Sequence, residues 1–220
     1  MAKRLVIFHT NPTLLGVLAD LCKEILPGVE LVNLVDDSLL PDVRKAGQVT
    51  TNVRKRICTY VEMAEAGGAD VVLNSCSSVS EVIDLASQLV TIPVIKIDQP
   101  MAEKAVDMGH AIGVIATVPT TVGPTTRLIE RCAAAKGRTV QIEVNLCSGA
   151  FDALMAGDTK RHDQLVLQAI EELAQRKDAV VLAQGSMARL VPQVKEEVRG
   201  KVLSSPRLGL ERVKEVLSGH

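Results

Sequence analysis

The sequence predicts an α/β fold made of two pseudo-symmetric lobes, each a doubly wound parallel sheet, with the active site in the cleft between them. Three observations support this prediction. Short β-branched runs alternate with amphipathic helical patterns, the second half of the chain repeats the first, and no low-complexity linker interrupts the 220 residues. The chain has 47% hydrophobic and 23% charged residues, which is typical of a globular protein long enough to bury a core.

The strands and helices are predicted from two different hydrophobic periods. Short runs of Val, Ile and Leu predict strands at Leu5–Phe8, Val29–Val35, Val71–Leu73, Val94–Ile97, Ile112–Ala116, Val140–Val144, Val180–Leu182 and Val202–Leu203. Apolar residues near a 3.6-residue period predict helices at Leu14–Ile25, Val53–Ala66, Val79–Leu89, Thr125–Ala135, Asp163–Gln175 and Leu208–Leu217. This alternation is typical of parallel sheets with helices on both faces.

The internal repeat is carried by three pairs of segments in the same order. VIFHTNPTLLGVLADLCKE parallels VIATVPTTVGPTTRLIERC, GADVVLNSCSSVSEVIDLA parallels KDAVVLAQGSMARLVPQV, and IPVIKIDQPMAEKAV parallels KVLSSPRLGLERVKEV. The spacing is similar too, since Thr10 and Cys76 are 66 residues apart and Thr117 and Gly185 are 68 apart. The alternative is that any two αβ halves share Val-rich strands. We predict a first lobe of residues 1–98 with 205–220 and a second of residues 99–204.

The repeat also predicts where a ligand binds. In doubly wound sheets the ligand crevice lies beyond the carboxyl ends of the strands, so residues that follow strands are candidates for binding. Their hydroxyl and amide groups, at helix starts with exposed backbone N–H groups, suit carboxylates or phosphates. The candidate substrate-binding residues are His9, Thr10, Asn11, Ser75, Ser77 and Ser78 in the first half, and Thr117, Thr120 and Thr121 in the second.

Cys76 is the candidate catalytic residue among the five cysteines. It lies in NSCSS, after a predicted buried strand and before a predicted helix, and a helix N-terminus lowers a thiol pKa and favours the reactive thiolate. The alternative is a small buried hydrophobe, but the flanking serines favour a functional thiol. The other four cysteines are predicted to be packing residues, although the position of Cys147 before a helix leaves a role in the cleft open.

The second-half counterpart of NSCSS is LAQGSM, which has no thiol. Aligning the strands places Gly185 opposite Cys76, and a shift of one residue places Gln184 or Ser186 there. Neither Gln184 nor Ser186 is a competent base near neutral pH, but both can donate hydrogen bonds to a developing oxyanion or enolate. His9 fits an acid–base group and a hydrogen-bonded strand-end residue equally well. For His162 a solvated capping turn is favoured over an acid or base.

Composition argues against several other function classes. Lys+Arg 25 and Asp+Glu 26 give a net charge of −1, and one Tyr and two Phe offer few rings for base stacking, so nucleic-acid binding is not expected. No apolar run is long enough for a signal peptide or a membrane span. The cysteines lack metal-ligand spacing and indicate free thiols in a reducing cytoplasm. Dinucleotide and nucleoside-triphosphate loops are absent.

Five segments, GADVVLNSCSS, PVIKIDQPMAEKAV, GVIATVPTTVGPT, FDALMAGDTKRHD and VVLAQGSMARL, together resemble the aspartate/glutamate/hydantoin racemase superfamily over essentially the whole chain. That superfamily also contains arylmalonate decarboxylase and maleate isomerase. The resemblance implies two pseudo-symmetric lobes, no cofactor or metal, a small carboxylate substrate in the cleft, and a homodimer. It also implies a cysteine from each lobe, on opposite faces of the substrate Cα.

Carried over by position, the first catalytic cysteine falls on Cys76. The carboxylate-binding positions fall on Thr10, Asn11, Ser75, Ser77, Ser78, Thr117 and Thr121. The second cysteine falls on Gln184, a departure that puts a two-base inversion in doubt. The leading expectation is a racemase or isomerase that uses a Cys76 thiolate, with Gln184 and Ser186 stabilising an enediolate. The alternatives are a one-cysteine decarboxylase or cis–trans isomerase, and a non-catalytic protein that binds small carboxylates.

Overall fold

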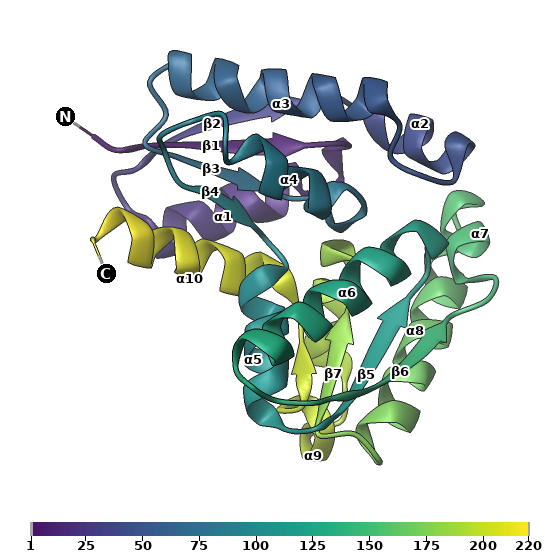
Figure 1. The fold of residues 1–220 in the computed structure, drawn as a ribbon. Helices are drawn as coiled ribbons and strands as arrows, with labels where there is room; N and C mark the ends of the chain where they lie inside the picture. Colours follow the sequence, from purple (N-terminus) through teal and green to yellow (C-terminus); the bar gives the residue numbers. More distant parts are fainter. Residues whose placement is uncertain (1, 220) are drawn as a thin grey trace. The chain divides into compact units, whose positions relative to one another are not determined.

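Each half of the chain forms one four-stranded parallel sheet in the computed structural model, which describes residues 2–219 (Figure 1). The strand order is β2-β1-β3-β4 in the first sheet and β6-β5-β7-β8 in the second, so the same connectivity occurs twice. The chain divides into two compact units, Met1–Gln99 with Pro206–His220, and Pro100–Ser205. The predicted fold of two pseudo-symmetric parallel-sheet lobes is confirmed.

The first sheet contains β1 (Arg4–His9), β2 (Glu30–Val35), β3 (Val71–Asn74) and β4 (Val94–Lys96). Its helices are α1 (Leu15–Ile25), α2 (Leu39–Ala46), α3 (Thr51–Ala66), α4 (Ser80–Ala86) and α10 (Ser205–Leu217), with the short 3-10 turns η1 (Pro12–Leu14) and η2 (Ser77–Val79). The second sheet contains β5 (Ala111–Ala116), β6 (Gln141–Leu146), β7 (Ala179–Leu182) and β8 (Val202–Leu203). Its helices are α5 (Gln99–Met108), α6 (Pro119–Ala135), α7 (Ala150–Met155), α8 (Thr159–Ala174) and α9 (Glu196–Arg199), with the 3-10 segment η3 (Gly185–Gln193).

The two faces of the first sheet are covered by different helices (Figure 1). Leu5 and Ile7 of β1 pack with Leu18 of α1 and Leu210 of α10 on one face. Phe8 points to the opposite face and packs with side chains of α2, α3 and α4. Because side chains alternate along a strand and both faces are covered, the central strand β1 reads as a continuous apolar run.

The second sheet is built in the same way, with α6 on one face and α8 on the other (Figure 1). Ile115 of β5 and Val180 of β7 pack with Ile170 of α8 in one buried cluster. At Gly113 of β5 an added Cβ would lie 2.9 Å from Leu173 Cδ1, so glycine lets α8 approach the strand closely.

Local signals explain several element ends. Thr50 Oγ1 accepts from Val53 N (3.3 Å) and caps α3, while Asp158 caps α8 at Arg161 N (2.9 Å). All eight predicted strands form, with end residues shifted by at most two positions. The predicted helix at 125–135 instead begins at Pro119, because proline at the first helical position presets the required φ.

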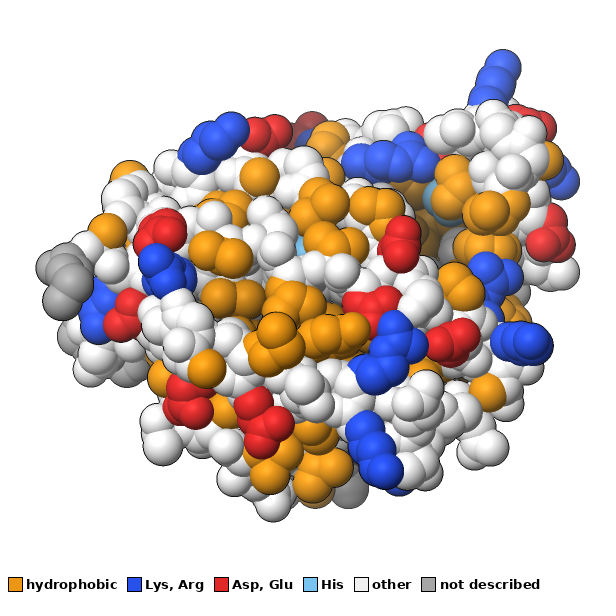
Figure 2. All heavy atoms as spheres, turned by 90° about the horizontal axis from the view of Figure 1, so that it is seen from above, with side chains coloured by type: hydrophobic (Ala, Val, Ile, Leu, Met, Phe, Trp, Pro, Cys, Tyr) orange, Lys and Arg blue, Asp and Glu red, His pale blue; other side chains and the backbone are white. Residues whose placement is uncertain are grey.

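The surface carries charges of both signs. On the face seen in Figure 2, basic and acidic side chains are interspersed with hydrophobic ones. Exposed hydrophobic side chains include Val32 and Val35 on edge strand β2, and Val144 and Leu146 on edge strand β6. Among residues 2–219, no helix combines the length and hydropathy that crossing a bilayer requires.

Candidate functional site

The strand registers show which residue of the second unit corresponds to Cys76. Leu5 pairs with Val71 in the first sheet, and Ile112 pairs with Ala179 in the second. Five residues beyond these partners lie Cys76 and Gln184. Both precede a 3-10 segment with extended backbone, at φ −123° and ψ 113° for Cys76 and φ −119° and ψ 131° for Gln184. Of the three alignments left open by the sequence, the one with Gln184 opposite Cys76 is therefore the structural one.

In the first unit, the ends of β1 and β3 bring together seven predicted site residues, which we call the Cys76 cluster: His9, Thr10, Asn11, Ser75, Cys76, Ser77 and Ser78. Backbone and side-chain bonds join the two strand ends. Ser75 donates to the Phe8 carbonyl oxygen through both its N–H (3.0 Å) and its Oγ (3.1 Å). Asn74 holds the following turn, with Nδ2 donating to Cys76 O (3.0 Å) and Oδ1 accepting from Cys76 N (3.4 Å). These bonds hold the backbone of Cys76 at the end of β3.

Cys76 is half-buried, whereas the neighbouring Ser77, Ser78 and Val79 are buried. The expectation of a lowered thiol pKa is wrong for this structure. Burial raises the pKa of the Cys76 thiol, and the negative charge of Asp98 adds to this effect. The Thr10 hydroxyl and the backbone N–H groups of Ser78 and Val79 act in the opposite direction but do not outweigh burial, since η2 is a turn of only three residues. Burial therefore favours the thiol form of Cys76 over the thiolate.

His9 is a hydrogen-bonded strand-end residue. Its ring has no exposed surface, and it lies between Asn33 Oδ1, 3.0 Å from Nε2, and Ser75 Oγ, 3.0 Å from Nδ1. Burial lowers the pKa of the imidazole, and the hydrogen bond to Asn33 only partly opposes this. Both ring nitrogens are thus engaged, one of them with Ser75, and the role of His9 in substrate binding stays a prediction.

The other members of the Cys76 cluster differ in their availability. Asn11 is half-buried, and its Oδ1 accepts from Thr13 N (2.9 Å) as the cap of η1. Thr10 is 1% exposed, and its Oγ1 has no hydrogen-bond partner among the described residues. A buried hydroxyl without a partner is uncommon and calls for a reason.

Asp98 belongs to the same sheet edge but was missed from the sequence. It follows β4, next to β3, and its side chain has no exposed surface. Ser80 Oγ donates to Asp98 Oδ1 (2.9 Å), whereas Oδ2 has no hydrogen-bond partner among the described residues. Burial raises the pKa of this carboxyl, while hydrogen bonds from Ser80 and Ser77 and the charge of Lys96 oppose the rise. An acidic residue directly after an apolar strand was the available signal.

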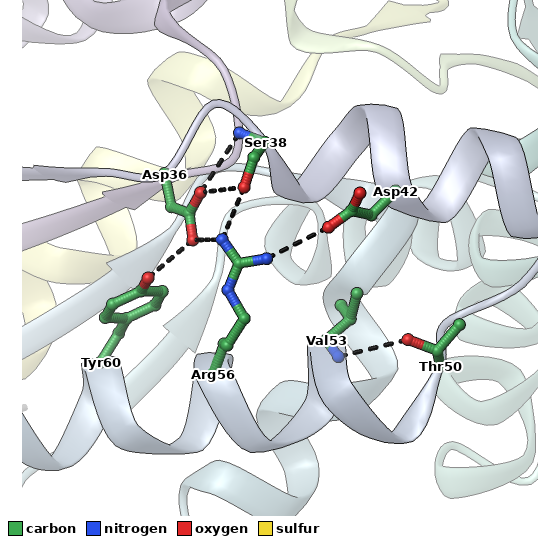
Figure 3. Close-up of polar contacts among 7 residues, drawn as sticks. All are labelled: Asp36, Ser38, Asp42, Thr50, Val53, Arg56 and Tyr60. Atoms are coloured by element: carbon green, nitrogen blue, oxygen red, sulfur yellow. Dashed lines mark hydrogen bonds and ion pairs between the residues drawn. The ribbon is translucent and has the colours of Figure 1, made fainter.

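A network of polar side chains supports the end of β2 (Figure 3). Asp36 follows this strand and accepts from Tyr60 Oη (2.7 Å), from Ser38 Oγ (2.7 Å) and from Arg56. Arg56 also donates to Ser38 Oγ (2.6 Å) and Asp42 Oδ2 (3.1 Å), which ties α2 to α3. Burial acts to raise the pKa of Asp36, but the bonds from Tyr60 and Ser38 and the charge of Arg56 together hold it below its usual value. Asp36 N donates to His9 O (2.9 Å), so this network fixes the strand end beside the Cys76 cluster.

The second unit brings together the other predicted site residues, which we call the Gln184 cluster: Thr117, Thr120, Thr121, Gln184 and Ser186. Gln184 Oε1 accepts from Thr117 N (3.1 Å) and, at a longer distance, from Thr117 Oγ1 (3.4 Å). Its Nε2 donates to Thr121 Oγ1 (2.7 Å), which in turn donates to Val118 O (2.8 Å). The Gln184 amide thus joins the end of β7 to the turn between β5 and α6, and Nε2 carries a second hydrogen that the bond to Thr121 does not use.

Thr120 and Ser186 are half-buried in the first turns of α6 and η3, whereas Thr117 and Thr121 are buried. Each unit therefore gathers its own predicted residues at the carboxyl edge of its sheet. The prediction that the two clusters face one cleft stays a prediction.

Two further residues that the sequence singled out, Cys147 and His162, are buried inside the second unit. Cys147 lies in the hydrophobic core, and burial raises the pKa of its thiol to about 11, as expected for a packing residue. His162 was predicted to lie in a solvated turn, but it is 3% exposed inside α8, where its Nδ1 lies 2.8 Å from Asp163 Oδ1. Asp163 is also bound by Arg189 of η3 (2.6 Å), so this group fastens η3 to α8. Among residues 2–219, no three His, Cys, Asp or Glu side chains are grouped as metal ligands would be.

The chain matches one protein-family model and resembles several solved structures. The model of the Asp/Glu/Hydantoin racemase family matches residues 5–213. The fold is similar to that of glutamate racemase from Bacillus anthracis, with a TM-score of 0.74, 18% identity, and coverage of 99% of this chain and 82% of that one. It is also similar to that of allantoin racemase from Klebsiella pneumoniae, with a TM-score of 0.71, 14% identity, and coverage of 99% of this chain and 88% of that one. For an aspartate racemase homologue from Pyrococcus horikoshii the TM-score is 0.74 and the identity 17%, with coverage of 99% of this chain and 100% of that one. No curated protein sequence matches the chain significantly.

Proposed function

Because the chain belongs to the Asp/Glu/hydantoin racemase family, we propose that it is a cofactor-independent racemase or isomerase of a small amino acid or dicarboxylic acid. The observation that carries the proposal is the Cys76 cluster. It holds a half-buried thiol at the carboxyl edge of a parallel sheet, where such folds bind their ligands, among hydroxyl groups suited to a carboxylate. Glutamate, allantoin and aspartate, named for the similar structures, define the substrates to test first.

In the proposed reaction, Cys76 acts as the base. The thiolate removes the proton from the substrate Cα, so the S–H bond forms as the C–H bond breaks and the electron pair passes into the substrate as an enediolate. Hydrogen-bond donors to the substrate carboxylate stabilise the developing charge. We assign that role to Ser75, Ser77 and Ser78, and in the second unit to Thr117, Thr121, Ser186 and the remaining N–H of Gln184. The reaction needs only side chains and no cofactor.

The proton is returned by the Cys76 thiol or by water. Gln184 cannot return it from the second unit, since an amide is no acid near neutral pH. A single thiol therefore predicts exchange of the Cα hydrogen in excess of inversion. In a two-thiol enzyme the opposite face would be protonated by the second cysteine.

The test is proton NMR in D₂O with L- and D-aspartate, L- and D-glutamate, allantoin and hydantoins. We expect loss of the Cα–H signal for at least one of these compounds, with chiral analysis measuring inversion separately. Absence of Cα exchange for all of them would refute racemase-type proton abstraction. Tight binding without exchange would indicate the non-catalytic carboxylate-binding protein instead.

A second candidate function is favoured by the Gln184 amide, which replaces a thiol at the position that corresponds to Cys76. A one-thiol enzyme suits decarboxylation with protonation on one face, or cis–trans isomerisation through an adduct of the Cys76 sulfur with an alkene. Incubation with maleate and with an aryl-substituted malonate, followed by NMR, tests both reactions. Conversion of either compound without Cα exchange of amino acids would favour this candidate.

We also propose that the protein acts as a homodimer in a reducing cytoplasm. Edge strands β2 and β6 expose valine and leucine side chains, which a second copy could cover, and no disulfide joins the cysteines in the part of the chain that the structure describes. One chain has a mass of 23.5 kDa, and light scattering after size exclusion should give twice that mass. The mass of a single chain at micromolar concentration would refute the dimer.

A further inference from the structure

Three polar side chains at the end of the first sheet form a chain of hydrogen bonds that runs from Asn33 through His9 to Ser75. Asn33 Oδ1 lies 3.0 Å from His9 Nε2, and Ser75 Oγ lies 3.0 Å from His9 Nδ1. The histidine ring has no exposed surface, whereas Ser75 is half-buried and precedes Cys76 in the sequence. A ligand beside Cys76 therefore reaches Ser75 and not the ring, and His9 acts through Ser75.

The second repeat shows that the fold does not need this chain of hydrogen bonds. The strand registers of the two sheets match residue for residue. By that match, the counterparts of the three residues in the second unit are Val144, Ala116 and Ala183. The same strand ends thus form with three apolar side chains. The polar set occurs in the unit that carries the Cys76 thiol, which indicates a role in the chemistry of that unit.

The hydrogens of the chain can be placed from what each atom is able to do. An amide oxygen only accepts, so His9 Nε2 carries a hydrogen and donates it to Asn33 Oδ1. A neutral imidazole has one N–H, which leaves Nδ1 to accept the single hydroxyl hydrogen of Ser75. Burial lowers the pKa of His9, and the bond to Asn33 only partly opposes this, so the neutral ring is the resting form near neutral pH.

The same atoms also suit the protonated ring. An imidazolium has two N–H groups, and Asn33 Oδ1 and Ser75 Oγ are already in place to accept from both. The hydroxyl hydrogen of Ser75 is then released, and the Phe8 carbonyl oxygen, 3.1 Å from Ser75 Oγ, is one acceptor for it. No heavy atom has to move between the two protonation states.

Carboxylate binding favours the protonated ring. If Ser75 donates to a carboxylate while the ring is neutral, His9 Nδ1 is left without a donor on a side chain that has no exposed surface, which costs free energy. A proton on Nδ1 removes this cost, because the new N–H donates to Ser75 Oγ. The seven residues of the Cys76 cluster include no lysine or arginine, so His9 is the member that can carry a positive charge.

We propose that His9 takes up one proton when a carboxylate binds at Ser75, and that the imidazolium is the counter-charge of the bound ligand. This inference deepens the proposed function, on which carboxylate binding at Ser75 rests. The step is balanced, since a proton from solvent forms an N–H bond on the Nδ1 electron pair while the Ser75 hydrogen turns from Nδ1 to the carboxylate. One carboxylate and the ring together become neutral, so less net charge is buried. His9 is thus a positioning residue.

The charged groups around His9 are engaged elsewhere or lie at the surface. Asp36 donates its backbone N–H to His9 O (2.9 Å), but its carboxylate is held by the network of Figure 3. The Cys76 thiol, beside Ser75, has a pKa that burial raises. Asp98 follows β4, which lies one strand further from β1 than β3 does. Helices α1 and α10 cover the face of β1 to which His9 belongs, and their exposed ionic side chains are Asp20, Lys23, Glu24, Arg207, Glu211, Lys214 and Glu215, with Arg212 half-buried.

The test attaches a carboxylate covalently beside Ser75, so it needs no known substrate. Cys76 is alkylated with iodoacetate, which adds a carboxylate, or with iodoacetamide, which adds an uncharged amide of the same shape. The Cys58→Ser protein is used, because Cys58 is half-buried and the other three cysteines are buried. The pKa of His9 is measured in both forms by nitrogen NMR of the labelled imidazole, with His9→Gln to assign the signal.

We expect the His9 ring to titrate about one pH unit higher in the carboxymethyl form than in the amide form. The signal of His110, which is exposed and precedes β5, is the internal control and should be the same in both forms. Equal pKa values of His9 in the two forms would overturn the inference. A neutral ring that carries its hydrogen on Nδ1 in place of Nε2 would also overturn it.

Ser75→Ala separates the hydrogen-bond chain from simple attraction between charges. Without the hydroxyl, Nδ1–H of the protonated His9 ring has no acceptor, so the difference between the two alkylated forms should fall to less than about half. A difference that persists in full would show that Ser75 does not couple the ring to the carboxylate, and the inference would fail.

Cys76→Asp and Cys76→Asn make the same comparison if the reagents do not reach the thiol. A His9 ring that titrates at the same pH in these two variants would overturn the inference. If the unmodified protein exchanges no tested substrate, the proposed function fails, while the pKa of His9 in the two alkylated forms still decides whether a carboxylate beside Cys76 is coupled to the ring.

Discussion

Gln184→Ala tests whether the amide of Gln184 holds the second strand-end cluster together. The substitution removes the bonds to Thr117 N (3.1 Å) and Thr121 Oγ1 (2.7 Å) and leaves the Thr117 N–H without its acceptor. A net contribution of about 1 kcal/mol for each bond gives a loss of about 2 kcal/mol in the free energy of unfolding. For a unit of this size that corresponds to a fall in Tm of roughly 8 °C.

The assay is urea and thermal unfolding followed by circular dichroism. Gln168→Ala is the matched control, because Gln168 is exposed on α8 and its side chain donates to the neighbouring Glu172 (2.8 Å) on the same helix. Its free energy of unfolding should change by less than about 0.5 kcal/mol. If Gln184→Ala changed stability as little as the control does, the amide would not be a structural link, and the reasoning about its single remaining N–H would be refuted.

Three further predictions concern the core, the buried histidine and the second repeat. Ile170→Ala should cost about 3 kcal/mol in urea unfolding, since Ile170 is fully buried between α8 and the second sheet, and a loss below about 1 kcal/mol would contradict that packing. The pKa of His9 is lowered in the folded state, so its contribution to stability is complete above about pH 6.5 and is lost as the pH falls through the folded-state value. His9→Gln should therefore weaken the fall in urea midpoint between pH 7 and pH 5, and an undiminished fall would contradict it. Gln184→Cys should raise inversion relative to Cα exchange in chiral NMR, and an unchanged ratio would show that a thiol at this position does not reach the substrate.

The strands could be predicted from the sequence because helices cover both faces of each sheet. Under those conditions the central strands β1, β3, β5 and β7 are short continuous apolar runs that stand out from the helical patterns. Helix α6 was placed too late, since Pro119 and Pro124 look like turn signals although Pro119 occupies the first helical position. The short helices α2 and α7 carry too few residues for a clear period.

The part of the candidate site that could be predicted consists of residues that come directly after strands. Cys76 and its serines could be found because parallel strands bring their carboxyl ends to one edge. The sign of the thiol pKa could not be predicted, because it depends on burial and on Asp98, which is 22 residues further along the chain. The hydrogen bonds of Gln184 could not be predicted either, because they depend on the direction of its side chain. Its amide points to the turn between β5 and α6 and bonds to Thr117 and Thr121 there.

In the proposed reaction, the Cys76 thiolate removes the substrate Cα proton. Its most direct test is the Cα–H exchange rate in D₂O for the unmodified protein, for Cys76→Ser and for the control Cys58→Ser, at equal saturation with the best substrate. We expect Cys76→Ser to lower the exchange rate by at least about 100-fold, because serine is too weak a base, and Cys58→Ser on α3 to exchange normally. Exchange in Cys76→Ser within about threefold of the unmodified protein would contradict it.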